Sequence, residues 1–251
     1  MKDARPTYGT IRRMPASGRF SPPTGRSLAR TAVELVATLA VLTALLVGVG
    51  WLITHPLKST MTHESSVNRW FADQRTSALT GLADLGTFLG QTLTGAVVLA
   101  VLGVVFAVWK RTLWPLVFVA VLDAGLGLFY LAGTSLDPRQ RPPVHILQSG
   151  LVADHSFPSG HTGTAVGIAA ASAALLWAYT RLPVGLLVVL VVIPVWTMLA
   201  RLYVGAHHVS DVLTELVVAS FWIWTCARLL LPRRTTAAAR ERTRAEAPAA
   251  A

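Results

Sequence analysis

The chain has 251 residues, of which 53% are hydrophobic and only 14% charged, and its formal net charge is +10. Soluble domains carry about 25% charged residues, so this composition excludes an ordinary water-soluble protein and indicates an integral membrane protein. The positive charge is concentrated in the two tails, which is typical of cytoplasmic segments of membrane proteins and argues against nucleic-acid binding. The single cysteine, Cys226, excludes an internal disulfide and a cysteine metal cluster.

The N-terminal part of the chain combines a polar tail with an apolar run. Residues 1–30 are basic and rich in Pro, Gly and Ser, so we expect a disordered cytoplasmic tail. The apolar run of residues 32–54 exceeds the roughly 20 residues that a helix needs to cross a bilayer. It is too long for a signal-peptide core and lacks a clear cleavage site, so we interpret it as an uncleaved first span. Apolar side chains at near-helical spacing between residues 67 and 89 predict short helices at the membrane interface.

Five further apolar runs complete the predicted domain, which covers residues 31–231. They span residues 90–109, 113–133, 161–180, 184–203 and 209–231, and a polar, proline-rich segment occupies residues 134–159. Residues 232–251 form a second basic tail, which we expect to be disordered and cytoplasmic. The predicted fold class is therefore all-α: a polytopic bundle of six transmembrane helices, with short interfacial helices between the first two spans.

The distribution of Lys and Arg predicts the orientation. With the N-terminus inside, the cytoplasmic segments hold sixteen of the 22 basic residues. This bias favours cytoplasmic N- and C-termini, which requires an even number of spans. The same topology puts three polar clusters on the outer face of the cell membrane, at residues 137–143, 157–161 and 201–211. Ionisable groups at a helix centre cost about 2.5–3.5 kcal/mol each, so three clusters on one side suggest a common site.

The residue types in these clusters suit phosphoryl transfer. Arginines offer planar, permanently charged forks for phosphate oxygens, and the N–H groups where a helix begins after Ser159 form an anion site. His207 and Asp211 are four residues apart, so on a helix they share a face and can hydrogen-bond. The carboxylate would fix the imidazole tautomer and leave the other nitrogen free to attack. A second histidine, His161, can protonate the leaving oxygen. This inventory predicts a metal-free reaction through a phosphohistidine, without a cofactor.

The three clusters resemble the signature of the type 2 phosphatidic acid phosphatase family, which includes membrane lipid phosphatases and soluble vanadium haloperoxidases. The family motifs are K-x-x-x-x-x-x-R-P, P-S-G-H and S-R-x-x-x-x-x-H-x-x-x-D. The matching residues are Arg141-Pro142 in the first, Pro158-Ser159-Gly160-His161 in the second, and Arg201, His207 and Asp211 in the third. The resemblance extends over about residues 30–231 and implies a six-span fold.

The resemblance also implies roles for individual residues. His207 would be the nucleophile, Asp211 its orienting partner and His161 the general acid. The phosphate would be held by Arg141, Arg201 and Ser159, together with the backbone of Gly160 at the start of the helix. His208, without a carboxylate one turn further on, is interpreted as a neighbour rather than the nucleophile.

Two positions depart from the family motifs. Thr134 stands where the lysine of the first motif is expected, and Ala200 stands in place of the serine of the third. Arg139, or a hydrogen bond from Thr134, would replace the phosphate-binding cation that the lysine supplies. Arg139 and Thr134 are therefore included among the predicted phosphate ligands.

The expected substrate is an amphipathic lipid phosphate or diphosphate drawn from the membrane lipids. Undecaprenyl diphosphate, the carrier used in building the cell envelope, is the first candidate; phosphatidic acid, phosphatidylglycerol phosphate and prenylphosphoryl sugar phosphates stay open. Two alternatives to a hydrolase also stay open at this point: a lipid phosphotransferase on the same fold, and a non-catalytic lipid-binding or transport relative.

Overall fold

A computed structural model describes residues 25–180, 182, 185 and 188–232. Most of both predicted tails, residues 1–24 and 233–251, lies outside these ranges. The described part of the chain is helical throughout, apart from its connecting segments. Its elements are α1 (Leu28–Thr54), α2 (Lys58–Met61), α3 (Ser65–Asp73), α4 (Ser77–Leu89), α5 (Thr92–Lys110), α6 (Trp114–Leu136), α7 (Gly160–Tyr179), α9 (Val192–Val204) and α10 (Val209–Leu230), with 3₁₀ turns at Thr62–Glu64 and Val188–Val191.

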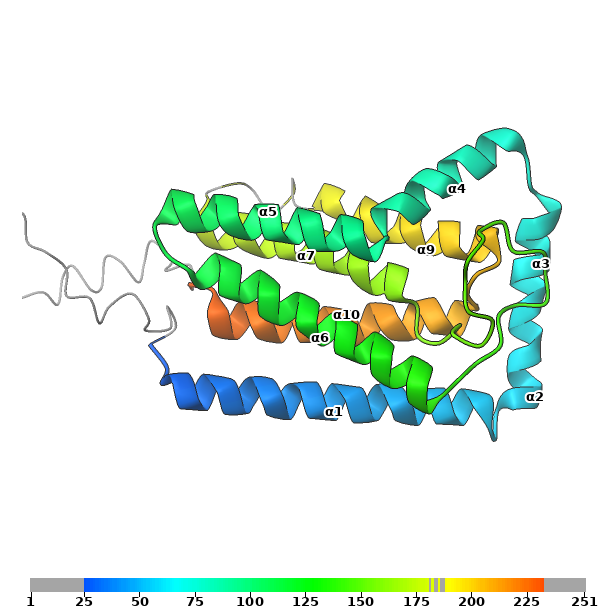
Figure 1. The fold of residues 1–251 in the computed structure, drawn as a ribbon, viewed down its shortest axis with the longest axis horizontal. Coiled ribbons are helices and arrows are strands. Elements are labelled where there is room, and N and C mark those ends of the chain that lie inside the picture. Colours follow the sequence, from blue (N-terminus) through cyan, green and yellow to red (C-terminus); the bar gives the residue numbers. More distant parts are fainter. Residues whose placement is uncertain (1–24, 181, 183–184, 186–187, 233–251) are drawn as a thin grey trace, which may run out of the picture.

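The long helices form an antiparallel bundle (Figure 1). Five of them, α1, α5, α6, α7 and α10, are long and apolar enough to cross a membrane. The predicted fifth span corresponds to the shorter apolar stretch Val188–Val204; its expected first residues, 184, 186 and 187, lie outside the described ranges. The prediction of an all-α polytopic membrane protein is confirmed.

The two ends of the bundle differ. One end, which we call the loop end, carries α2, α3 and residues 137–159 (Figure 1). At the opposite tail end, α1 begins, α5 connects to α6, and α10 finishes. Both ends of the described chain therefore lie at the tail end, as an even number of passes requires.

Local signals explain where the helices begin and end. α1 starts at Leu28, four residues before the predicted span, because the Ser27 side chain caps it by accepting from Arg30 N. α6 starts with Pro115 in its first turn and continues to Leu136, so Thr134 is helical and not part of the predicted polar segment. Ser159 caps α7 by accepting from Thr162 N, as its position before the helix predicts.

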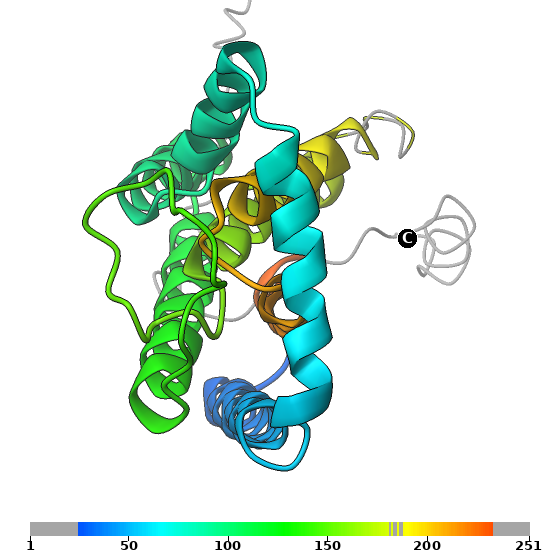
Figure 2. The same ribbon diagram turned by 90° about the vertical axis from the view of Figure 1, so that its right-hand side faces the viewer.

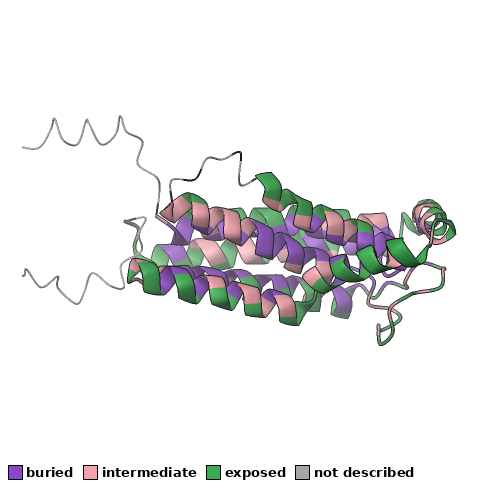
Figure 3. Cartoon of the chain, turned by 90° about the horizontal axis from the view of Figure 1, so that it is seen from above, coloured by how far each residue is buried: buried purple, intermediate pink, exposed green. Residues whose placement is uncertain are grey.

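α7 and α10 are the most buried of the long helices, and they pack against each other in the middle of the bundle. The indole N–H of buried Trp222 on α10 donates to Leu122 O on α6 at 3.0 Å. The outward faces of the helices are exposed (Figure 3), and many large apolar side chains lie on them, as expected of surfaces in contact with lipid.

The short helices between the first two spans have two different placements. α2, the Thr62–Glu64 turn and α3 form one segment, residues 58–73, which we call the strap. The strap runs from the end of α1 across the loop end of the bundle to α4 (Figure 2). α4 packs along α9, and its expected position at the membrane interface stays a prediction. The helices come close because Gly86 faces Trp196 and Ala200, and the Trp196 indole donates to Leu82 O at 3.0 Å.

Candidate active site

Backbone hydrogen bonds bring the three polar clusters together at the loop end. Arg139 N donates to Asp154 O at 2.7 Å, and Ser156 N donates to Arg139 O at 3.0 Å, so the first cluster runs beside the segment that leads into the second. Leu147 N donates to Val204 O at 3.1 Å, which attaches the same loop to the end of α9. The predicted convergence of distant segments is therefore present in the fold.

His207 lies in the short connection between α9 and α10. α9 ends at Val204, followed by Gly205 as its C-cap with φ +81°, and α10 begins after His208. The buried His207 ring places Nδ1 2.6 Å from Ser156 O. A carbonyl only accepts, so Nδ1 carries the proton and Nε2 keeps its lone pair. Within the described residues the ring forms its hydrogen bond through Nδ1, and Nε2 makes none.

The orienting contact of His207 differs from the sequence-based expectation. The nearer carboxylate oxygen of Asp211 is 3.9 Å from Nδ1, beyond hydrogen-bond distance. The reason is that His207 precedes α10, so the two residues do not share a helical face. The carbonyl of Ser156 supplies the hydrogen bond that was expected from the carboxylate.

Asp211 organises the surroundings of His207. Its Oδ2 accepts from Ser156 Oγ at 2.6 Å and from His208 N at 2.8 Å, and its Oδ1 is ion-paired with Arg139. The carboxylate thus holds both Ser156, whose carbonyl orients the imidazole, and the backbone that follows His207. Its effect on the His207 ring is indirect.

Two buried side chains of the site have unused hydrogen-bonding groups. Arg201 is fully buried; its Nη1 donates to Gln148 Oε1 at 2.6 Å and Thr87 Oγ1 at 3.2 Å, while Nε and Nη2 have no partner within the described part of the chain. His161 Nε2 is likewise buried and unpartnered there. A buried polar group without a partner costs about 1–3 kcal/mol, and more when it is charged. Such groups are poised to receive an anionic ligand.

Burial and neighbouring charges keep His207 neutral. Desolvation lowers the pKa of His207 well below its usual value, and the positive charges of Arg201 and Arg141 lower it further. The imidazole is therefore unprotonated at neutral pH, the form that a nucleophile needs.

Arg141 braces the loop end and faces the site. Its guanidinium donates to three carbonyls, of Val152, His155 and Ala206, at 2.6–3.0 Å. A guanidinium has five N–H groups, so two remain after these bonds. Arg141 therefore has capacity for a phosphate oxygen as well as a structural role.

The remaining predicted phosphate ligands have different surroundings. Ser159 Oγ accepts from the Thr162 hydroxyl at 2.9 Å, and Gly160 lies against the Tyr130 ring in the first turn of α7. Thr134 donates its hydroxyl to Tyr130 O at 2.8 Å, within its own helix. Arg139 is shared between the carboxylates of Asp211 and Glu64. Phosphate binding by Thr134 and Arg139 stays a prediction that these contacts do not favour.

A family model described as the PAP2 superfamily matches residues 112–234, a range that contains all three motifs. This region of the chain belongs to the PAP2 superfamily. The protein is a phosphoric ester hydrolase of the lipid phosphatase class, and it has five helices that are long and apolar enough to cross a membrane.

A solved structure shows the same fold. It is the first transmembrane PAP2-type phosphatidylglycerolphosphate phosphatase from Bacillus subtilis, with a TM-score of 0.62 and 20% sequence identity, and the match covers 77% of this chain and 92% of that one. No curated protein matches the sequence significantly.

Several residues of this PAP2 site were not found from the sequence. Ser156 lies two residues before the second motif, and only that proximity pointed to it. Thr87 and Gln148, which hold Arg201, and Glu64 and Asn68 on the strap carry no local signal. Their partners are more than 50 residues away in the sequence, so only the fold identifies them.

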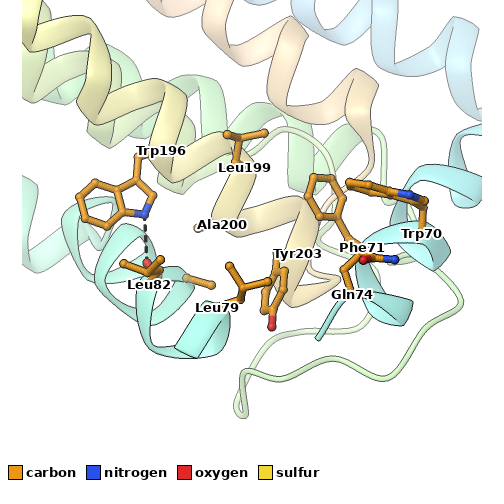
Figure 4. A pocket seen from close by; sticks show the side chains of 10 residues that line it. Trp70, Phe71, Gln74, Leu79, Leu82, Trp196, Leu199, Ala200 and Tyr203 are labelled. Carbon is orange, nitrogen blue, oxygen red and sulfur yellow. Dashed lines mark hydrogen bonds between the residues drawn. The ribbon is translucent and has the colours of Figure 1, made fainter. Parts of the chain in front are cut away.

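An apolar groove of about 290 Å³ lies beside the site, between α3, α4 and α9 (Figure 4). Trp70 and Phe71 of α3 form one wall, Leu79 and Leu82 of α4 the other, and Ala200 lies between them. Ala200 directly precedes Arg201, so the groove reaches the segment that carries the buried arginine.

Proposed function

We propose that this PAP2 phosphatase removes phosphate from a lipid phosphate or diphosphate through a phosphohistidine at His207. A polyprenyl diphosphate such as undecaprenyl diphosphate is the first candidate substrate. The relative of known structure is named for phosphatidylglycerolphosphate, which makes that glycerolipid the second candidate.

The observation that best supports this proposal is the hydrogen bonding and tautomer of the buried His207 ring. Its Nδ1–H is fixed on Ser156 O at 2.6 Å, and its Nε2 is left without a partner in a site that also contains the unused donors of Arg201. A neutral imidazole with a fixed tautomer beside cations is what attack on phosphorus requires.

The reaction follows from these positions in two steps. The lone pair of His207 Nε2 attacks phosphorus, the P–O bond to the lipid breaks, and the leaving oxygen takes a proton from His161. Water then attacks the phosphohistidine, gives its proton to His161, and the P–N bond breaks to release phosphate. Arg201, Arg141 and the N–H groups near Ser159 and Gly160 would stabilise charge on the phosphoryl oxygens.

The lipid tail would lie in the apolar groove between α3, α4 and α9. Its two tryptophans and its leucines offer a surface for an alkyl or prenyl chain, and Ala200 in its lining directly precedes Arg201. Each buried methylene contributes about 0.8 kcal/mol.

Filling this groove tests where the tail binds. We expect Ala83→Trp to raise KM for a long-chain lipid phosphate about tenfold, the loss of about two methylene contacts. KM for a short, water-soluble phosphate ester should not change. Equal effects on both substrates would remove the groove from the proposal.

The nucleophile is tested with a matched pair of histidine variants. In a phosphate-release assay over a panel of lipid phosphates, His207→Ala should lower kcat/KM at least about 10⁴-fold. His208→Ala is the control, because the His208 Nε2 lies 3.2 Å from Gln140 O and the proposed reaction gives this ring no role. Loss of activity in His208→Ala with activity retained in His207→Ala would overturn the assignment. Phosphate released only when an acceptor lipid is added would indicate a transferase.

We further propose that the loop end lies outside the cytoplasm and the tail end inside. Lys110 ends α5 and Arg111 follows it at the tail end, where Arg26, Arg30 and Arg228 also lie. Over the full sequence, the segments assigned to this side hold sixteen of the 22 basic residues. Such a concentration of basic residues marks the cytoplasmic side.

A further inference from the structure

We propose that two residues of the strap, Glu64 and Asn68, are positioning residues for the nucleophile His207. The inference rests on the proposed function, in which His207 is the nucleophile. The strap lies across the loop end of the bundle, in front of the start of α10 in Figure 2.

Asn68 holds the backbone of the nucleophile. Its side chain is fully buried, and its Nδ2 donates to His207 O at 3.0 Å and to Leu202 O at 3.2 Å. Both partners are carbonyls, so the amide nitrogen must face them. One side chain thus ties the end of α9 to the residue before α10. Since Ser156 O holds the ring, His207 is fixed at both its backbone and its imidazole.

Glu64 holds the start of α10. Its Oε2 accepts from Ser210 N at 2.7 Å, and its Oε1 accepts from Ser210 Oγ at 2.9 Å. Ser210 lies in the first turn of α10, where backbone N–H groups have no partner inside the helix and a carboxylate is favourable. The Glu64 side chain therefore fixes the helix end that His207 and His208 lead into.

Glu64 also shares a cation with Asp211. Arg139 Nη2 lies 3.3 Å from Glu64 Oε1, while Nη1 is paired with Asp211 and donates to Ser210 Oγ at 2.7 Å. The Glu64–Arg139–Asp211 chain connects the strap to the carboxylate that holds Ser156. A shift of the strap would therefore move His207 in two ways. It would act on the His207 backbone through Asn68, and on the His207 ring through Arg139, Asp211 and Ser156.

These contacts predict an effect on turnover rather than on substrate affinity. Neither Glu64 nor Asn68 contacts Arg201, so phosphate binding should survive their loss. Attack on phosphorus needs an aligned nucleophile, and a displacement of about 1 Å can cost about 100-fold in rate. The expected signature is a lower kcat with little change in KM.

Four variants test the proposal in the full-length protein in detergent. We expect Asn68→Ala and Glu64→Ala to lower kcat about 10- to 100-fold, with KM within about twofold of wild type. Glu64→Gln keeps an acceptor for Ser210 N but loses the charge, so its kcat should fall in between. Ser66→Ala is the matched control: it lies on the same helix, is exposed, and bonds only His63 O of its own segment. Its kcat should equal that of wild type.

A second measurement separates positioning from general damage. Hydrogen exchange of the peptide covering residues 203–210 should be faster in Asn68→Ala and Glu64→Ala than in wild type and Ser66→Ala, with α5 and α6 unaffected. Unchanged kcat, unchanged exchange in this peptide, or a fall in kcat/KM carried entirely by KM would overturn the inference. Those results leave the proposed function intact. That function fails instead if wild type releases no phosphate from any lipid, or if His207→Ala has no effect.

Discussion

Each end of the bundle contains a charged side chain that pairs with two or more side chains of the opposite charge. The two clusters differ in how far these side chains are buried. At the tail end, the Glu34 carboxylate is shared by Arg26, Arg30 and Arg228 at 2.5–3.5 Å, with its side chain a quarter exposed and that of Arg30 72% exposed. At the loop end, the Arg139 guanidinium is shared by two carboxylates, and the side chains of Arg139 and Asp211 are 9% and 0% exposed.

This difference separates two uses of the same ion-pair chemistry. Exposed pairs are solvated and screened, and they contribute little to stability. A buried pair adds little net stability either, but removing one partner leaves an uncompensated charge and costs about 3–5 kcal/mol. The tail-end cluster therefore suits a solvated surface, whereas the loop-end cluster fixes one geometry around His207.

The largest expected effect comes from breaking the buried pair. Arg139→Leu should destabilise the protein by about 3–5 kcal/mol, because the Asp211 carboxylate keeps only its hydrogen bonds to Ser156 and His208. Thermal unfolding in detergent should show the loss as a lower Tm.

A double variant controls this result. Adding Asp211→Asn to Arg139→Leu removes the orphaned charge and should recover part of the lost stability, as a double-mutant cycle measures. If Arg139→Leu instead raises KM and leaves Tm unchanged, Arg139 is a phosphate ligand and the ion pair is incidental.

The next prediction is that mild acid leaves activity unchanged, where a solvated histidine nucleophile would lose about tenfold. A solvated histidine with a pKa of about 6.5 is only about one-tenth neutral one unit lower. Because burial lowers the His207 pKa, its imidazole stays neutral at that pH, and kcat/KM should not fall with a pKa near 6.5. A pH profile of kcat/KM checks this, and a loss assigned to His207 near pH 6.5 would contradict a buried, neutral ring.

Stability, unlike activity, should fall as the pH is lowered below about 6.5. The unfolded chain binds a proton at His207 below about pH 6.5, whereas the folded protein does so only below its lowered pKa. The His207 contribution is therefore present above pH 6.5 and is lost as pH falls from there toward the lowered value. Midpoints of thermal unfolding between pH 5 and 7.5 test the sign.

The smallest effect should come from the tail end. Glu34→Gln removes the carboxylate from an exposed cluster, so neither Tm nor kcat should change measurably. A loss comparable to that of Arg139→Leu would show that the tail-end cluster is structurally as important as the loop-end one.

The sequence was most informative where a local pattern determines the structure. Apolar length located the five long helices to within a few residues, and Ser159 was recognisable as a helix cap. The three motifs led to the histidines, to Arg201 and to the convergence of distant segments. These signals are the length of an apolar run, a capping residue next to a helix, and the spacing of residues within a motif. Each of them can be read from a short stretch of sequence.

The partners of the motif residues could not be predicted in the same way. The interval between His207 and Asp211 suggested a shared helical face, but α9 ends between Arg201 and His207, and Ser156 takes the expected place of the carboxylate. Arg139 looked like a spare phosphate ligand because Glu64 is 75 residues away in the sequence. Contacts between residues so far apart in the sequence depend on how the helices pack, and a single sequence does not reveal that packing.

The turn at Gly205 means that the spacing of the third motif determines how Arg201 and His207 lie relative to each other. Gly205 N donates to Leu202 O and Ala206 N donates to Arg201 O, both at 3.1 Å, so the chain reverses within a single helical turn after the arginine. One inserted residue in α9 would rotate the guanidinium by about 100° away from the imidazole. A side chain at the glycine would meet Val144 at 2.6 Å in a backbone conformation that L-residues rarely adopt. The number of residues between Arg201 and His207 thus sets the relative position of the two side chains. Insertions or deletions in this interval should therefore be less tolerated than substitutions within it.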